Sequence, residues 1–181
     1  MKSAVRFAGT MLLALVASAV TSTGANAQQH VTHSVSPQAT SPEADKQAVR
    51  AAVTGFETAV AALDFDLADS HLTSDARWIE ESEPVPAQPW PKWFHDAKAA
   101  GIHIEYRIRQ MDVTLHGDTA WTTLTMDGIF TASNPAGRAL LQNASVRKRT
   151  FVESEILVRT PSGWKIALGH TTTLADQHSS L

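Results

Sequence analysis

A single long amphipathic helix precedes a β-rich second half, and this order constrains the fold more than any other feature of the chain. Ser41-Pro42-Glu43 can open a helix, because serine caps well, proline suits the first turn and acidic residues favour the positive end of the helix dipole. Apolar residues then recur with the spacing of one helix face, at Val49, Val53, Phe56, Val60 and Leu63. We predict a helix over 42–63 with that face directed at a core.

The second half has the β-branched and aromatic content of strands separated by turn signals. The pattern predicts strands over 102–116, 119–131, 147–159 and 164–173, with a loop over 132–145. Along the first of these strands, the apolar residues of one face have even numbers up to Ile108 and odd numbers from Met111 on. This change predicts a β-bulge that bends the sheet. Shorter elements are expected between the two halves: helices over 67–72 and 93–100, a strand over 76–80 and a proline-rich loop over 84–91. Helices followed by antiparallel strands indicate an α+β domain with helices on one face of a curved sheet.

The N-terminus has the features of a cleavable signal peptide. Lys2 and Arg6 precede an apolar run that ends near Val20, and Ala25-Asn26-Ala27 supplies the small residues of a cleavage site after Ala27. The run is shorter than the roughly 20 residues of a membrane-spanning helix, so we expect no stable membrane anchor. The expected organisation is a signal peptide over 1–27, a disordered leader over 28–41, one domain over 42–173 and a tail over 174–181. The location would be periplasmic or secreted.

Composition narrows the possible chemistry. The chain has no cysteine, which excludes disulfides, thiol catalysis and thiolate zinc sites. Asp and Glu number 18 against 15 Lys and Arg, so there is no basic footprint for nucleic acid. Phosphate-loop, dinucleotide and serine-elbow motifs are missing, and His95-Asp96 and His103-x-Glu105 each fall short of a metal site. We therefore expect no cofactor and no metal, with chemistry resting on His, Asp and Glu.

His170 and Glu153 are the first candidates for that chemistry. On the last strand His170 shares parity with Trp164 and Ile166, which must face the core. A tight turn over 160–163 would place Glu153 opposite His170 on the neighbouring strand, and a carboxylate beside an imidazole can poise a general acid or base. The alternative is a structural histidine satisfied by its neighbours.

Other residues remain open to two interpretations. Asp127 is a further candidate base if its face of the strand is inward, and is otherwise an exposed or bulge residue. Arg147-Lys148-Arg149 is either a solvated strand entrance or a site for an anionic ligand. Aromatic residues could line a pocket for a flat apolar ligand or simply fill the core; those expected at the pocket are Phe56, Trp78, Trp93, Tyr106 and Trp121.

Three segments give the domain a family resemblance. They are Ala62-Leu63-Asp64-Phe65-Asp66 at the end of the first helix, the hairpin Val113 to Trp121, and the C-terminal run Gly163-Trp164-Lys165-Ile166-Ala167-Leu168-Gly169-His170-Thr171-Thr172. In these segments and their order, residues 42–173 resemble the SnoaL-like and ketosteroid isomerase-like members of the nuclear transport factor 2-like superfamily.

The resemblance implies a cone-shaped half barrel, in which a strongly bent antiparallel sheet wraps around the long N-terminal helix and leaves a pocket. It also implies a homodimer and a pocket-lining histidine at the place of His170. The helix tyrosine of ketosteroid isomerases is missing here, since Tyr106, the one tyrosine of the chain, lies on a strand.

Fold does not settle function in this superfamily. One hypothesis is a cofactor-independent acid/base enzyme of isomerase, cyclase or dehydratase type that acts on a small apolar carbonyl compound. The others are a noncatalytic module that binds a small apolar molecule and a dimerising interaction module, both in the cell envelope.

Overall fold

The computed structural model describes residues 41–81, 83–87 and 90–174. The predicted signal peptide, the leader up to residue 40 and the tail from residue 175 lie outside these residues. The elements in chain order are α1 (Pro42–Ala61), α2 (Phe65–Ser70), β1 (Leu72–Glu80), β2 (Glu83–Pro86), α3 (Lys92–Ala99), β3 (His103–His116), β4 (Thr119–Thr131), α4 (Pro135–Leu140), β5 (Val146–Thr160) and β6 (Gly163–Leu174).

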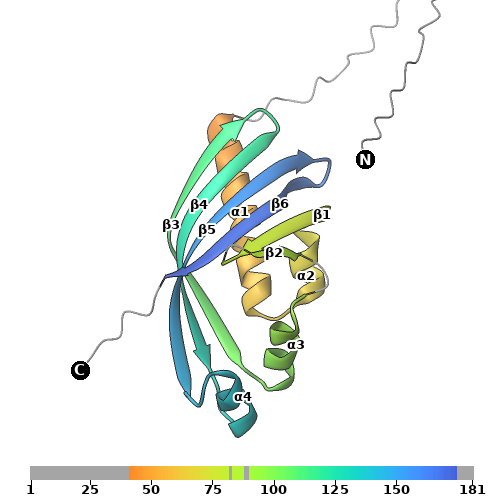
Figure 1. Cartoon of the computed structure of the whole chain (residues 1–181). Helices are drawn as coiled ribbons and strands as arrows, with labels where there is room; N and C mark the ends of the chain where they lie inside the picture. The colour runs from red at the N-terminus through yellow and green to blue at the C-terminus, as the bar shows by residue number, and fades with distance from the viewer. Residues whose placement is uncertain (1–40, 82, 88–89, 175–181) are drawn as a thin grey trace, which may run out of the picture. The chain divides into compact units, whose positions relative to one another are not determined.

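The strands of the described residues form one sheet in the order β2-β1-β6-β5-β4-β3. Neighbouring strands are antiparallel except β1 and β6, which pair in parallel. Figure 1 shows β3 to β6 bending sharply, with α1 along the concave side of the sheet. The sheet does not close, so the predicted α+β half barrel around a long helix is confirmed. None of the described helices is long and apolar enough to cross a membrane.

The first helix follows its predicted signals. The Ser41 side chain accepts a hydrogen bond from the backbone amide of Ala44 at 3.2 Å, and proline occupies the first turn. The predicted apolar face is buried at Val49, Val53, Phe56 and Val60. The helix ends at Ala61 rather than at residue 63, because Leu63 has a positive φ of 54° and turns the chain while its side chain stays buried.

Two bulges bend the long strands. The predicted one is present in β3, where the pairing with β4 shifts between Ile108 and Gln110. The second lies in β6 and was not predicted: Ile166 pairs with Leu157 and Leu168 pairs with Ile156, which leaves Ala167 as the extra residue. Each bulge increases the local twist, which lets the sheet curl around α1.

Two predicted loops contain regular structure. Residues 83–86 of the proline-rich segment form β2, an edge strand in which Val85 pairs with Trp78 of β1, consistent with the tolerance of proline at sheet edges. Residues 135–140 form α4, whose first turn is capped by Asn134 through a 2.8 Å bond from the amide of Gly137. The capped Asn-Pro sequence was the available signal for that helix.

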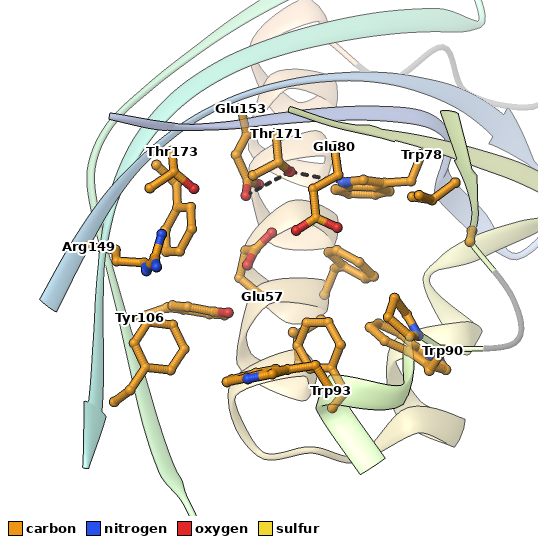
Figure 2. Close-up of a pocket in the computed structure, with 18 of the residues that line it drawn as sticks. Glu57, Trp78, Glu80, Trp90, Trp93, Tyr106, Arg149, Glu153, Thr171 and Thr173 are labelled. Atoms are coloured by element: carbon orange, nitrogen blue, oxygen red, sulfur yellow. Dashed lines mark hydrogen bonds between the residues drawn. The ribbon is translucent and has the colours of Figure 1, made fainter. Parts of the chain in front are cut away.

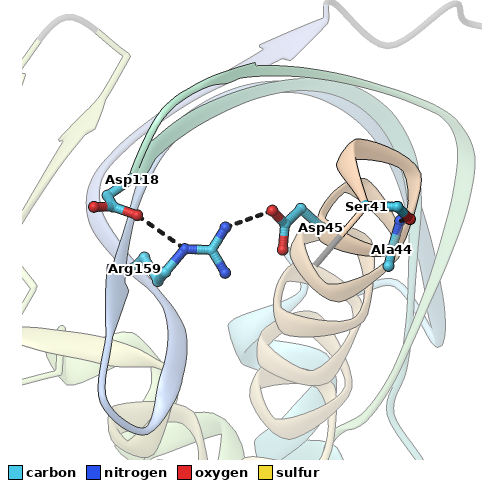
Figure 3. Close-up of polar contacts among 5 residues, drawn as sticks. All are labelled: Ser41, Ala44, Asp45, Asp118 and Arg159. Carbon is cyan, nitrogen blue, oxygen red and sulfur yellow. Dashed lines mark hydrogen bonds and ion pairs between the residues drawn. The ribbon is translucent and has the colours of Figure 1, made fainter. Parts of the chain in front are cut away.

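One arginine ties the start of α1 to the sheet (Figure 3). Arg159 of β5 donates to Asp45 of α1 at 2.6 Å and to Asp118 of the β3–β4 turn at 3.0 Å. Its guanidinium also lies 4.5 Å from the centre of the Trp164 ring. This linkage fixes α1 against the sheet at the end remote from the cavity described next.

Candidate functional site

A cavity of about 370 Å³ opens between the concave face of the sheet and the helices. Its walls come from α1, α3, α4 and strands β1 to β6, as Figure 2 shows for part of the lining. The volume lies within the range of small-molecule sites. Glu57 and Glu153 meet at its inner wall, and the aromatic residues surround them.

Aromatic rings form most of the apolar wall. Phe56 lies 5.4 Å from Trp78 between ring centres, and Trp93 contacts both Phe94 and Phe130 edge to face. These contacts hold the rings in fixed positions, so the wall is preformed for a flat apolar ligand. The predicted lining residues Phe56, Trp78, Trp93 and Tyr106 all face the cavity; the other aromatic members are Trp90, Phe94, Phe130 and Phe151.

Three carboxyl groups form a buried cluster at the inner wall. Glu57 comes from α1, and Glu153 and Glu155 come from the inward face of β5. One oxygen from each lies within 4.8 Å of the others, and the side chains are 5%, 5% and 1% exposed. Three negative charges so close together in a buried place would repel strongly, so the cluster must keep protons.

The pKa values of the cluster express this constraint. Burial raises the pKa of Glu57 well above its usual range, and the charges of Glu153 and Glu155 add to the rise. Burial raises the pKa of Glu153 to about 7, against the lowering effect of hydrogen bonds with Glu57 and Thr171. Burial likewise raises the pKa of Glu155 to about 8, against a hydrogen bond from Thr122. Near neutral pH, Glu57 and Glu155 therefore stay protonated while Glu153 exists in both forms.

A hydrogen-bond chain orients Glu153. The indole N–H of Trp78 donates to Thr171 Oγ1 at 2.8 Å, and the Thr171 hydroxyl donates to Glu153 Oε1 at 3.1 Å (Figure 2). The deeper Glu155 accepts from Thr122 Oγ1 at 2.7 Å. Because the indole can only donate, the Thr171 hydroxyl is directed at Glu153, which fixes one carboxylate oxygen and leaves the group facing the cavity.

Tyr106 completes the polar part of the wall. Its ring lies on β3 and its hydroxyl points into the cavity on the side of Glu57 (Figure 2). Burial and then the charge of Glu57 raise the pKa of Tyr106 well above its usual range, so the phenol is neutral. The cavity thus contains two neutral O–H donors, Tyr106 and protonated Glu57, next to a carboxyl that can lose its proton.

The predicted pairing of Glu153 with His170 is wrong. Glu153 pairs with Thr171, and His170 pairs with Ser154 on the opposite, exposed face of the sheet. The cause is the bulge at Ala167, which keeps Ile166 inward and brings Gly169, Thr171 and Thr173 inward in place of the expected parity. The structure therefore does not bring His170 to the cavity.

Gly169 explains why β6 adopts this register. A Cβ at this position would lie 2.3 Å from the Trp78 ring, so the indole can occupy its place only over a glycine. A strand without the bulge would put Leu168 or His170 on the inward face instead, against that ring. The contact between β1 and β6 therefore selects the register that brings Thr171 to Glu153.

Two further predicted site residues lie away from the cavity. Asp127 forms an ion pair with Arg109 at 2.6 Å and accepts from Thr150 at 3.0 Å, on the outer side of the sheet. Trp121 is 50% exposed and packs at a tilt against His116, with 5.4 Å between ring centres. The Asp127 side chain faces outward and is 27% exposed, so the structure does not support the interpretation of an inward-facing base.

The sequence interpretation missed Glu57, Glu155 and Thr171. A signal for Glu57 existed: it lies four residues after Val53 and three before Val60, so it interrupts the buried face of α1 with a charge. Glu155 likewise shares parity with Glu153 and buried Leu157. For Thr171 there was no local signal, because its orientation depends on the Ala167 bulge.

The same carboxyl cluster is the place where a cation would fit best among the described residues. Glu57, Glu153 and Glu155 offer the oxygen ligands that hard divalent ions prefer. A cation there would have to displace the protons that burial holds on these groups.

Similar solved structures place this architecture in the nuclear transport factor 2-like class. A superfamily protein from Salmonella enterica serovar Typhimurium has a TM-score of 0.61 at 12% identity, over 76% of this chain and 96% of that one. A candidate dehydratase of the same class from Streptomyces avermitilis has a TM-score of 0.56 at 19% identity, over 74% and 99%. The association domain of C. elegans CaMKII has a TM-score of 0.56 at 14% identity, over 71% and 95%. At these identities the likeness concerns the fold alone.

Within that class the family is defined by sequence. Residues 49–175 match the model of the SnoaL-like domain, and the chain belongs to the SnoaL-like family. No curated protein matches the sequence significantly. The predicted family membership is confirmed.

Proposed function

We propose that the protein is a cofactor-independent acid/base enzyme, of isomerase, cyclase or dehydratase type, acting on a small apolar carbonyl compound. The observation that carries this proposal is the position of Glu153 in an aromatic cavity, with a pKa of about 7 and a neutral acid beside it. Groups whose surroundings push their pKa values apart are suited to divide the roles of base and acid.

The roles follow from the protonation states. The Glu153 carboxylate removes a proton from the carbon next to the substrate carbonyl; the electron pair of that C–H bond forms a C=C bond, and the π pair of the carbonyl moves to its oxygen. Tyr106 and protonated Glu57 donate hydrogen bonds to the oxygen as its charge develops, which stabilises the enolate in a site of low dielectric. Return of the proton from Glu153 to another carbon completes an isomerisation. In a dehydration the proton passes from Glu153 to a hydroxyl on the next carbon; the C–O bond breaks, water leaves and the carbonyl re-forms beside a new C=C bond.

Proton exchange from a flat ketone tests the proposal without knowledge of the natural substrate. In D₂O the protein should accelerate deuterium incorporation next to the carbonyl of 2-tetralone, measured by NMR. The rate should rise with pH around 7, because the base acts only after Glu153 loses its proton. Glu153→Gln should abolish the acceleration.

The matched control is Glu83→Gln, which alters an exposed carboxyl of β2 and should leave exchange unchanged. Exchange that proceeds equally in Glu153→Gln, or that wild type does not accelerate at any pH, would refute the catalytic proposal. Binding of 2-tetralone without exchange would favour the second candidate, a noncatalytic pocket for a small apolar molecule, which the preformed aromatic wall supports.

We also propose that the protein is exported and forms a homodimer. The charged start, apolar run and Ala25-Asn26-Ala27 support export, and N-terminal sequencing of envelope-fraction protein should begin at Gln28. Apolar side chains on the outer sheet face support dimerisation: Trp121 and Ile156 are ladder partners, 50% and 40% exposed, and Val152 is on the same face of β5 at 37%.

A further inference from the structure

Arg147-Lys148-Arg149 lies near the start of β5, and successive residues of a strand face opposite sides of the sheet. Part of this basic run therefore faces the cavity and can affect which ligands bind there. Arg147 and Arg149 face the cavity together with Phe151 and Glu153. Lys148 lies between the two arginines on the other side of the sheet and is exposed. One strand therefore carries two arginines, an aromatic ring and the carboxyl base along a single wall of the cavity.

Arg149 is placed to receive an anion. Its guanidinium lies in the half-buried lining near Thr173 and across the cavity from Trp78 (Figure 2). Within the described residues no carboxylate forms an ion pair with it; Glu81 exerts only a longer-range attraction. A partly desolvated guanidinium gains most from a planar anionic group that accepts two of its hydrogen bonds.

The protein does not satisfy Arg149 with its own base. Glu153 is four residues away on the same extended strand, about 13 Å between backbone positions, and Phe151 lies between them on the same face. Because the cluster keeps protons, the inner wall also has less negative charge than its carboxyls suggest. The remaining carboxyl of the lining, Glu80, lies on the side of Trp78, across the cavity from Arg149 (Figure 2). An anionic ligand can therefore enter with its charged end at Arg149.

We infer that the cavity takes an organic carboxylate with a flat apolar body, whose carboxylate binds Arg149 while its far end lies against Glu153 and Tyr106. The aromatic wall packs the body, and the spacing along β5 separates the anionic head from the reacting carbon. The inference rests on the proposed function for the nature of the far end, a carbonyl group. The anionic head is derived from Arg149 alone.

A binding assay tests this inference independently of turnover. The probes are 2-naphthoate and its neutral counterpart 2-naphthamide, titrated at low salt with isothermal calorimetry at pH 6, where the probe is ionised and the carboxyl cluster keeps its protons. We expect the carboxylate to bind about 10- to 100-fold more tightly, the range for a charge-assisted hydrogen bond in a partly buried place. The difference should shrink with added salt.

Variants of adjacent residues give the control. Arg149→Gln should bring the two affinities to within about threefold, Arg149→Lys should retain part of the preference, and Lys148→Gln should retain all of it. Equal affinities in wild type, failure of 2-naphthoate to bind, or a preference that survives in folded Arg149→Gln would overturn the inference. If Arg149→Gln does not fold, the inference is judged from the ratio of 2-naphthoate to 2-naphthamide affinity in wild type and in Arg149→Lys.

The two proposals fail separately. A carboxylate preference without 2-tetralone exchange refutes the catalytic proposal and leaves the ligand class standing. Exchange of 2-tetralone without a preference for the carboxylate probe refutes the ligand class and leaves the catalytic proposal standing.

Discussion

The buried carboxyl cluster should make the protein less stable as the pH rises, and Glu155 offers the clearest test. Its pKa is about 8 in the folded domain against an ordinary value of 4.5. Between these values the folded state keeps a proton that the unfolded state has released. Stability is therefore complete below about pH 4.5 and falls until the pH exceeds the folded value.

The magnitude follows from the size of the shift. Each pKa unit corresponds to about 1.4 kcal/mol, so Glu155 costs about 5 kcal/mol of unfolding free energy above pH 8. The same reasoning for Glu153, from 4.5 to about 7, gives about 3 kcal/mol. A domain of this size has about 5 to 15 kcal/mol in total, so the decline is a large part of it.

The assay is urea unfolding of wild type and Glu155→Gln, followed by tryptophan fluorescence between pH 4.5 and 9. Glutamine can keep the hydrogen bond from Thr122 and cannot ionise. The unfolding free energy of the variant should therefore fall by about 5 kcal/mol less than that of wild type over this pH range. The exposed variant Glu83→Gln should follow wild type throughout. A Glu155→Gln curve parallel to wild type, or a wild-type stability that increases toward pH 9, would show that the carboxyls are not protonated as we describe.

Three other changes test separate parts of the structure. Gly169→Ala should lower the unfolding free energy by about 2 kcal/mol or more, because its Cβ would meet the Trp78 ring at 2.3 Å; unchanged urea unfolding would argue against the register of β6. Asp45→Asn should cost about 1 kcal/mol by weakening the bond to Arg159, and high salt should reduce the difference in thermal unfolding. Trp121→Ser should shift the protein from dimer to monomer in analytical ultracentrifugation with little loss of fold, whereas a wild-type monomer would contradict the proposed interface.

Periodicity in the sequence was sufficient for the fold. The spacing from Val49 to Val60 and the capping signal at Ser41 gave α1, and the parity change after Ile108 gave the β3 bulge, because each depends on residues close together in the chain. The bulge at Ala167 could not be predicted in this way. It depends on Gly169 meeting Trp78, two residues that are far apart in sequence.

The candidate site was accessible only in part. Four of the aromatic residues were predicted from composition, and Glu153 was predicted as the partner of His170; the structure brings these five residues to one cavity although Glu153 pairs with Thr171. Glu57 could have been found as a charge within an apolar face. The proximity of Glu57 to Glu153 and Glu155 joins a helix to a strand about a hundred residues later, and no local pattern encodes such a contact.

The extra residue in β6 limits how roles can be transferred among members of this family. If residues are paired by counting equally along β5 and β6 from the turn that joins them, His170 becomes the partner of Glu153. A catalytic role assigned to His170 in this way would belong to an exposed side chain. When the residues of β6 are instead assigned by their pairing partners on β5, the partner of Glu153 is Thr171. Two relatives can therefore share a length of strand, a motif and a histidine in the aligned column, and still present different side chains to their ligands. Relatives should therefore be aligned in this strand by the residue that each position pairs with on the neighbouring strand, and not by its distance in sequence from the turn.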